Sequence, residues 1–176
     1  MVAIEMGLVG APFILLLVTI LDLGLMLATQ SVLEGAARDA ARLIRTGQAQ
    51  AQSSPITTFQ TLLCNDMSSL MTVASCDTSV VFEVQTFSSF GAISMTPCTQ
   101  SANQTGNGTV CQFTPGNASD IVAVQATYNR PFIVPWVSAC LTGGSCWIGL
   151  GTTNGSNAGT GTAPLVSTVI FRNEPY

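Results

Sequence analysis

The sequence contains no histidine and no lysine, so arginine supplies all five of its basic residues. Only 8% of its residues are charged, and the formal net charge is −4 at pH 7. A protein that follows a phosphate backbone needs a patch of basic side chains, which argues against nucleic-acid binding. Without histidine or a C-x-x-C spacing, a zinc site would need an irregular set of thiolates. We therefore expect neither nucleic acid nor a metal or other cofactor as a ligand.

Motifs for enzyme catalysis are missing as well. The sequence has no G-x-S-x-G nucleophile elbow, no phosphate-binding P-loop and no pair of acids whose spacing indicates a shared site. We therefore expect that the protein is not an enzyme and has no catalytic residues. Two function classes remain open at this point. One is a structural subunit that polymerises through its first helix, and the other is a membrane-anchored module that displays an extracytoplasmic binding domain.

The N-terminal part of the chain lacks charge over an unusual length. No residue between Glu5 and Asp22 is charged, and apolar residues prevail over residues 6–37. About 20 predominantly apolar residues are enough to span the hydrocarbon core of a bilayer. A secretory signal peptide would instead show a basic start, a shorter apolar block and a small-residue cleavage site. The helical pattern continues with Glu34 placed four residues before Arg38, so we expect one long helix, apolar at its start and amphipathic at its end.

The rest of the chain predicts a small globular domain. Ser54 and Pro55 are typical of a helix start, and a second helix is predicted to reach about residue 71. Period-two runs rich in β-branched and aromatic residues predict antiparallel strands at residues 80–87, 121–128 and 165–171. We therefore predict an α+β protein, with a membrane or polymerisation helix in residues 1–52 and a globular, disulfide-bonded head with a small antiparallel sheet in residues 53–176.

All six cysteines follow the apolar segment, at Cys64, Cys76, Cys98, Cys111, Cys140 and Cys146. An even number of cysteines in the part of a chain that would be exported indicates disulfides, although fifteen pairings are possible in principle. Sequence order favours the nearest-neighbour set, in which the first cysteine pairs with the second, the third with the fourth and the fifth with the sixth. Under the chain-entropy model, closing loops of this size contributes on the order of 2–3 kcal/mol each.

The N-terminal segment VAIEMGLVGAPFILLLVTILDLGLMLATQSVLEGAARDAAR resembles the start of the TadE-like pilins, a pseudopilin family of tight-adherence, type IV pilus-like systems. The stretches FQTLLCNDMSSLMTVASC, DIVAVQATYNRPFIVP and VIFRNEPY are also similar to the family pattern, and FRNEPY is the most specific of them. The basic leader ending in glycine that is usual in the family is missing. The resemblance therefore implies a chain already cut by a prepilin peptidase, with Glu5 in the fifth mature position.

This resemblance implies a structural pilin that is held in the inner membrane as a precursor and then polymerises into an extracellular helical filament on the bacterial surface. Its role would be adhesion or surface attachment. The implied partners are further copies of the chain, the prepilin peptidase and the pilus assembly machinery, including an assembly ATPase and a platform protein. A minor pseudopilin that primes a filament of another pilin is the alternative within the family.

Three residues of the first helix are candidates for assembly. The resemblance favours an assembly role for Glu5, although an acid near a helix N-terminus is also stabilised by the helix dipole alone. The α-amine of Met1 is expected to be mostly protonated at neutral pH, and Glu5 could neutralise it within one chain or between neighbouring subunits. Asp22 would cost about 2.5–3.5 kcal/mol at the centre of a bilayer. Either Asp22 has a partner or lies outside the lipid, or it reaches the outer membrane interface.

Further along the helix, Arg38, Arg42 and Arg45 form one stripe. The stripe is either a solvated face or a stop-transfer-like cluster, or it is a set of partners for acids on neighbouring subunits. Small residues recur at a spacing that lets helices approach closely, although alanine is also simply a good helix former. Pro12 removes one backbone hydrogen bond from the helix, and we expect a kink or an unwound turn there.

N-x-S/T sequons, which are candidates for glycosylation, occur in the predicted loops at Asn103, Asn107, Asn117 and Asn154. Such short motifs also arise by chance in sequence that is rich in asparagine and threonine. O-linked sugar on the same hydroxyl-rich loops is an equal alternative.

Overall fold

The computed structural model describes residues 2–95, 110–133 and 162–175 of the chain. Its longest element is the helix α1, Val2–Arg45, which runs through Pro12 without an unwound turn. The second helix, α2, covers Pro55–Asp66 and is shorter than predicted. A 3₁₀ turn, η1 (Met67–Ser69), and a helix absent from the prediction, α3 (Val73–Ser79), follow it. Thr72 caps α3 by accepting a hydrogen bond from the Ser75 backbone N–H.

The strands are β1 (Val80–Phe87), β2 (Val110–Phe113), β3 (Ile121–Pro131) and β4 (Thr162–Arg172), and a short 3₁₀ turn, η2 (Phe90–Ala92), follows β1. They form one sheet in the order β2-β1-β3-β4. This sheet confirms the α+β prediction. It is mixed rather than wholly antiparallel, however, because β1 pairs with β3 in antiparallel and with β2 in parallel orientation. The parallel strand β2 lies in a stretch that the prediction had assigned to a loop.

The contacts divide the chain into two compact units, with one boundary inside α1. Unit 1 comprises Met1–Ala28 and Arg130–Pro164, and unit 2 comprises Thr29–Asn129 and Leu165–Tyr176. The proposed functional division into residues 1–52 and 53–176 stays a prediction.

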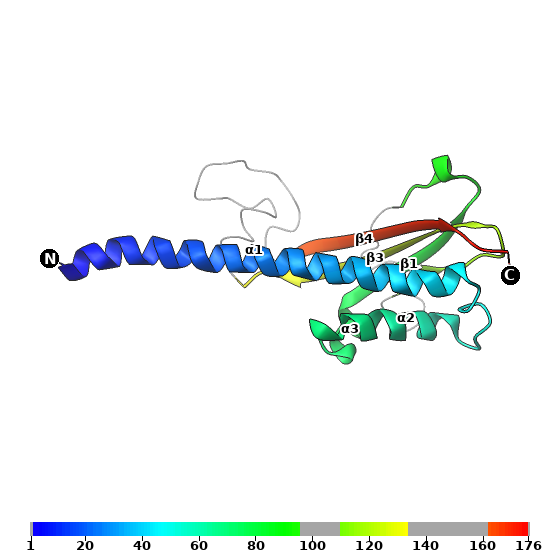
Figure 1. Cartoon of the computed structure of the whole chain (residues 1–176), viewed down its shortest axis with the longest axis horizontal. Coiled ribbons are helices and arrows are strands. Elements are labelled where there is room, and N and C mark those ends of the chain that lie inside the picture. The colour runs from blue at the N-terminus through cyan, green and yellow to red at the C-terminus, as the bar shows by residue number, and fades with distance from the viewer. Residues whose placement is uncertain (1, 96–109, 134–161, 176) are drawn as a thin grey trace. The chain divides into compact units, whose positions relative to one another are not determined.

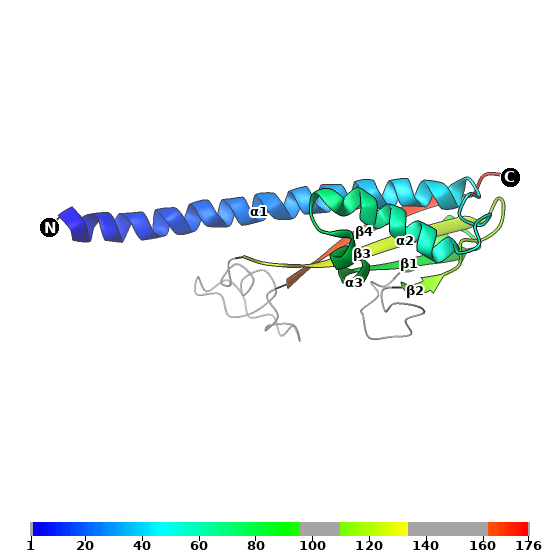
Figure 2. The ribbon, with the colours of Figure 1, turned by 90° about the horizontal axis from the view of Figure 1, so that it is seen from below.

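Unit 2 contains the hydrophobic core. Figures 1 and 2 both show α2 beside the C-terminal part of α1. Phe59 of α2 stacks on Phe82 of β1 with ring centroids 5.0 Å apart, and both rings contact Phe113 of β2. The part of α1 in unit 2 contributes mostly small side chains to this core, namely Leu33, Ala36, Ala37, Ala40, Ala41 and Ile44, each at most 2% exposed. Small residues let the helix backbone approach the other elements closely, which explains their spacing in the sequence.

The two faces of the sheet differ in chemistry because side chains alternate along a strand. Phe82 and Val84 of β1 lie opposite Ala126 and Val124 of β3, so this face is apolar. On the other face, the buried Glu83 lies opposite the buried Gln125. Hydrogen bonds tie these polar side chains to the neighbouring Gln85 and Thr168. Burial without such partners would be costly.

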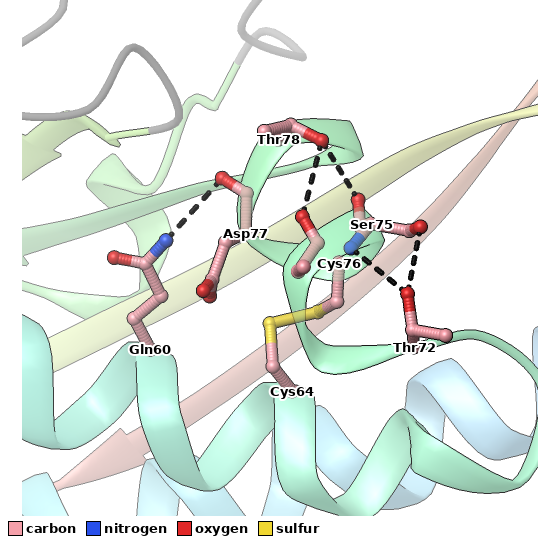
Figure 3. The surroundings of a disulfide bond; sticks show 8 residues. Gln60, Cys64, Thr72, Ser75, Cys76, Asp77 and Thr78 are labelled. Carbon is pink, nitrogen blue, oxygen red and sulfur yellow. Dashed lines mark hydrogen bonds between the residues drawn. A yellow bond between two sulfur atoms is a disulfide. The ribbon is translucent and has the colours of Figure 1, made fainter.

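The disulfide predicted between Cys64 and Cys76 is present and joins α2 to α3 (Figure 3). Both cysteines are buried, and their Cα atoms are 5.5 Å apart. The same two helices are also joined by a hydrogen bond from Gln60 Nε2 to the Asp77 carbonyl oxygen. Cys111 is disulfide-bonded as well. Cys98, Cys140 and Cys146 lie outside the described residues, so the remaining two predicted pairings stay predictions.

The C-terminal residues 172–174 close unit 2. Arg172 Nε donates to the Ser119 carbonyl oxygen, and the Asn173 amide donates to the carbonyl oxygens of Pro115 and Asn117. Arg45 donates through both Nε and Nη2 to Glu174 Oε1, at 3.0 and 2.7 Å, and the Glu174 N–H bonds the Arg45 carbonyl oxygen. These bonds give a structural role to residues 172–174, because they fasten the end of β4 to a turn and to the C-terminus of α1.

Candidate functional site

The candidate functional surface is the N-terminal part of α1 in unit 1. Within the described residues of this chain, its apolar side chains are uncovered: Leu8 is 75% exposed, Phe13 59%, Leu16 54% and Leu21 66%. Gly7, Gly10 and Gly24 have nothing within 4 Å of the position that a Cβ would take. A helix that is apolar all round is stable only when something else covers it, either lipid or other protein.

By length and composition, α1 is able to cross a membrane, and among the described residues no other helix meets that test. The core helix of a soluble protein can meet the same test, but such a helix is covered by its own chain. The exposed leucines of residues 8–21 are not. This part of α1 therefore differs from residues 29–45, which supply the buried side chains of unit 2.

Asp22 interrupts the apolar surface and is buried. Its side chain is 1% exposed, and its Oδ1 accepts a hydrogen bond from Arg130 Nη1 at 3.0 Å. Arg130 lies near the end of β3, and its side chain is 11% exposed. The sequence left open whether Asp22 has a partner, and the structure shows that it has one, Arg130 of the same chain. The second oxygen, Oδ2, is buried and has no hydrogen-bond partner among the described residues.

Arg130 was not identified as a site residue from the sequence. It lies 108 positions from Asp22, and no local pattern links two residues so far apart. The available signal was chemical, because Arg130 is one of only two basic residues outside the first helix and Asp22 is a single acid in an apolar run. An acid in such a place requires a compensating charge.

Two arginines of the predicted stripe, Arg38 and Arg45, have ion-pair partners inside their own chain. Arg38 lies 3.6 Å from Glu34 at the predicted i,i+4 spacing, and both side chains are largely exposed, so this pair contributes little to stability. Arg45 binds Glu174, as described above. Arg42 lines a cavity of about 380 Å³ together with Asp39 and Asp66. An assembly role for Arg38, Arg42 and Arg45 stays a prediction.

The pKa of the Asp66 carboxyl is raised, first by desolvation and then by the nearby Asp39 carboxylate. Both acids line the cavity described above together with Arg42. Within the described residues no cluster of three or more His, Cys, Asp or Glu side chains is placed to hold a metal ion.

Two sets of predicted site residues cannot be placed. Met1, Asn103, Asn107 and Asn154 lie outside the described residues, and only the helical backbone is described at Glu5.

Asn117 is described and exposed. Its backbone N–H donates to Asp120 Oδ2, in a turn whose Ser119 has φ 69°. Its glycosylation stays a prediction.

The geometry defines a class of protein: an α+β chain whose N-terminal helix is long and apolar enough for a membrane and carries an uncovered apolar surface. The model of the TadE-like protein family matches residues 1–42, which is consistent with a TadE-like, pilin-related protein. The resemblance read from the sequence is thereby confirmed for this segment, and for the later stretches it stays a prediction. No curated protein and no solved structure matches the chain. The family implies involvement with a pilus assembly system, and the apolar helix fits a membrane-anchored, pilus-associated protein.

Proposed function

We propose that the chain is a pilin-type structural subunit with no enzymatic activity. Its precursor is anchored in the inner membrane by α1, and the mature subunit polymerises through the same helix into an extracellular helical filament for adhesion or surface attachment. The observation that carries this proposal is the exposure of the apolar side chains in the N-terminal part of α1. Lipid covers these side chains before assembly, and neighbouring copies of α1 cover them afterwards.

The TadE-like match over residues 1–42 supports the proposal, because it falls on the segment that would enter the filament core. The proposed partners are further copies of this chain, a prepilin peptidase and the pilus assembly machinery. The Cys64–Cys76 disulfide also supports an extracytoplasmic location, since disulfides persist in oxidising compartments.

The test is the effect of Glu5→Ala on filament incorporation. We expect Glu5→Ala to leave membrane insertion and the folding of unit 2 intact and to reduce incorporation severely, because an apolar filament core would lose a compensating charge. Incorporation is measured by shearing cells and quantifying the subunit in the filament fraction, with electron microscopy of that fraction. Glu34→Ala is the matched control, since the Glu34 side chain is 43% exposed and pairs with Arg38 on the surface of the same helix.

Normal filament yield from Glu5→Ala cells, together with unchanged yield from Glu34→Ala cells, would remove the proposed assembly role of Glu5. A sheared fraction in which this subunit is a trace component would favour the minor-pseudopilin alternative. Retention of the entire wild-type chain in the membrane, with none in the sheared fraction, would favour a membrane-anchored binding module.

A further inference from the structure

The Asp22–Arg130 ion pair lies at the end of the uncharged part of α1. Residues 6–21 carry no charge, and Glu5 and Asp22 bound them. At a rise of 1.5 Å per residue, these two acids are about 26 Å apart along the helix axis. The hydrocarbon core of a bilayer is about 30 Å thick, and small mismatches are absorbed at modest cost. The segment between the two acids is therefore close to the length that a bilayer requires.

Within the described residues, the hydrogen bonds of the ion pair leave one oxygen of Asp22 without a partner. Asp22 Oδ2 is buried without a hydrogen-bond partner among the described residues. The bond to Asp22 uses one of the five N–H donors of the Arg130 guanidinium. The remaining donors need water or phosphate oxygens, and hydrocarbon offers neither. Moving such a pair into the lipid interior would therefore be costly, whereas the headgroup layer offers water and phosphate oxygens to the 11% of the Arg130 side chain that is exposed.

We infer that residues 6–21 form the lipid-spanning surface of the membrane-anchored chain and that the Asp22–Arg130 pair fixes its depth by remaining in the headgroup layer. The exposed apolar side chains beyond Asp22, at Leu23, Leu25 and Leu27, then lie in that layer, since the farthest of them is only about 8 Å beyond Asp22 along the helix axis. This inference rests on the membrane-anchored stage of the proposed function. Its partner is the bilayer itself, not another protein.

The test maps the boundary with single cysteines in the full chain, reconstituted into phosphatidylcholine nanodiscs that leave both membrane faces accessible. Cysteine is introduced in turn at Leu16, Val18, Leu21, Leu25 and Leu27, all exposed in the chain. Each variant is treated with a membrane-impermeant maleimide, and the chain without an added cysteine is the control for background labelling. We expect Leu16 and Val18 to be protected, Leu21 to react at least tenfold more slowly than Leu27, and Leu25 and Leu27 to react readily.

Two paired variants test whether the ion pair sets this boundary. In Asp22→Leu/Arg130→Leu the charges are gone, so we expect the helix to move deeper and position 25 to become protected. In Asp22→Arg/Arg130→Asp the pair is kept with its charges exchanged, so we expect the wild-type boundary. Near-ultraviolet circular dichroism shows for each variant whether unit 2 has folded. An unchanged boundary in the folded leucine variant would overturn the inference.

Labelling of all five positions in the wild-type background would overturn it as well, because the helix would then lie outside the bilayer. Failure of the inference differs from failure of the proposed function in its readout. Filament incorporation in cells does not depend on the maleimide boundary. An unchanged boundary in the folded leucine variant, together with normal filaments from wild-type cells, would therefore remove the depth role of Asp22–Arg130 and leave polymerisation in place.

Discussion

Gly116 has a backbone conformation that other residues rarely adopt, with φ +72°. A Cβ at this position would lie 2.7 Å from Thr86 Cγ2, closer than real carbon contacts. The turn that contains Gly116 also receives the hydrogen bonds of Asn173, so its position matters for the closure of unit 2. The residue is therefore constrained by both its backbone and its surroundings.

We expect Gly116→Ala to destabilise unit 2 by about 1–2 kcal/mol, because positive φ disfavours any Cβ and the clash adds to that cost. Chemical unfolding of the full chain in detergent, followed by circular dichroism, measures the change. Gly91→Ala is the control, since nothing lies within 4 Å of its added Cβ. Equal stability of the two variants would contradict the role of Gly116.

We expect Asp66 to make the stability of unit 2 depend on pH. Its carboxyl pKa is raised above the ordinary 3.8 by desolvation and by Asp39. The folded chain therefore binds this proton more tightly than the unfolded chain does, and the group's contribution to stability falls as the pH rises from 3.8 through the folded pKa. Above the folded pKa of Asp66 the carboxyl is ionised in both states, and the full loss of stability remains.

We expect Asp66→Asn to raise the unfolding midpoint at pH 7 and to lose that advantage at about pH 3, where aspartate is protonated in both states. Thermal unfolding at the two pH values measures this. Asp39→Asn is a second probe, because it removes the Asp39 charge and leaves the desolvation of Asp66 in place. We expect it to lower the pKa of Asp66 part of the way toward its ordinary value, as measured by carbon-detected NMR titration. An advantage of Asp66→Asn that is equal at both pH values would refute the assignment.

At the scale of elements, the short helices α2 and α3 depend on covalent and apolar contacts. The Cys64–Cys76 bridge spans a sequence separation of 12 and is buried at both ends. Removing it with Cys64→Ala/Cys76→Ala should cost about 3 kcal/mol by the chain-entropy relation. Denaturant unfolding of the double variant, compared with the wild type under the same non-reducing conditions, gives the difference. A loss below 1 kcal/mol would show that α2 and α3 are held by packing alone.

At the scale of the whole molecule, one helix serves two environments. Leu33 is fully buried in unit 2, whereas Leu16 is 54% exposed in unit 1. We expect Leu33→Arg to prevent folding of unit 2, because it buries an unpaired charge. Leu16→Arg should leave the unfolding midpoint unchanged and reduce the membrane-retained fraction, since an arginine near the bilayer centre costs about 2.5–3.5 kcal/mol on insertion scales.

Sedimentation of membranes after alkaline extraction, alongside limited proteolysis of unit 2, separates these two effects. If Leu16→Arg unfolded unit 2 as Leu33→Arg is expected to do, the exposed surface of α1 would have a structural role inside the chain. The family match over residues 1–42 covers both positions and so does not distinguish them.

Local patterns in the sequence determined the elements themselves. The uncharged run and its helical continuation predicted α1, and period-two alternation placed β1, β3 and β4 within a few residues of their observed bounds. The helix α1 ends at Arg45, inside the predicted segment of residues 1–52, and Gly47 adopts φ 75° just beyond that end. Such signals act over a few residues, so a sequence displays them directly. The nearest-neighbour disulfide between Cys64 and Cys76 was predictable for the same reason.

Contacts between distant residues were decided only by the tertiary structure. The sequence showed that Asp22 would be unfavourable in an apolar segment, but its partner Arg130 lies 108 positions away. Glu174 likewise lies 129 positions from Arg45. The parallel β1–β2 pairing likewise depends on a short strand whose sequence is also compatible with a loop. The alanines of α1 were ambiguous between helix propensity and close packing until the core of unit 2 showed them buried. In each case the deciding free energy comes from burial and charge compensation across the fold, which local periodicity does not encode.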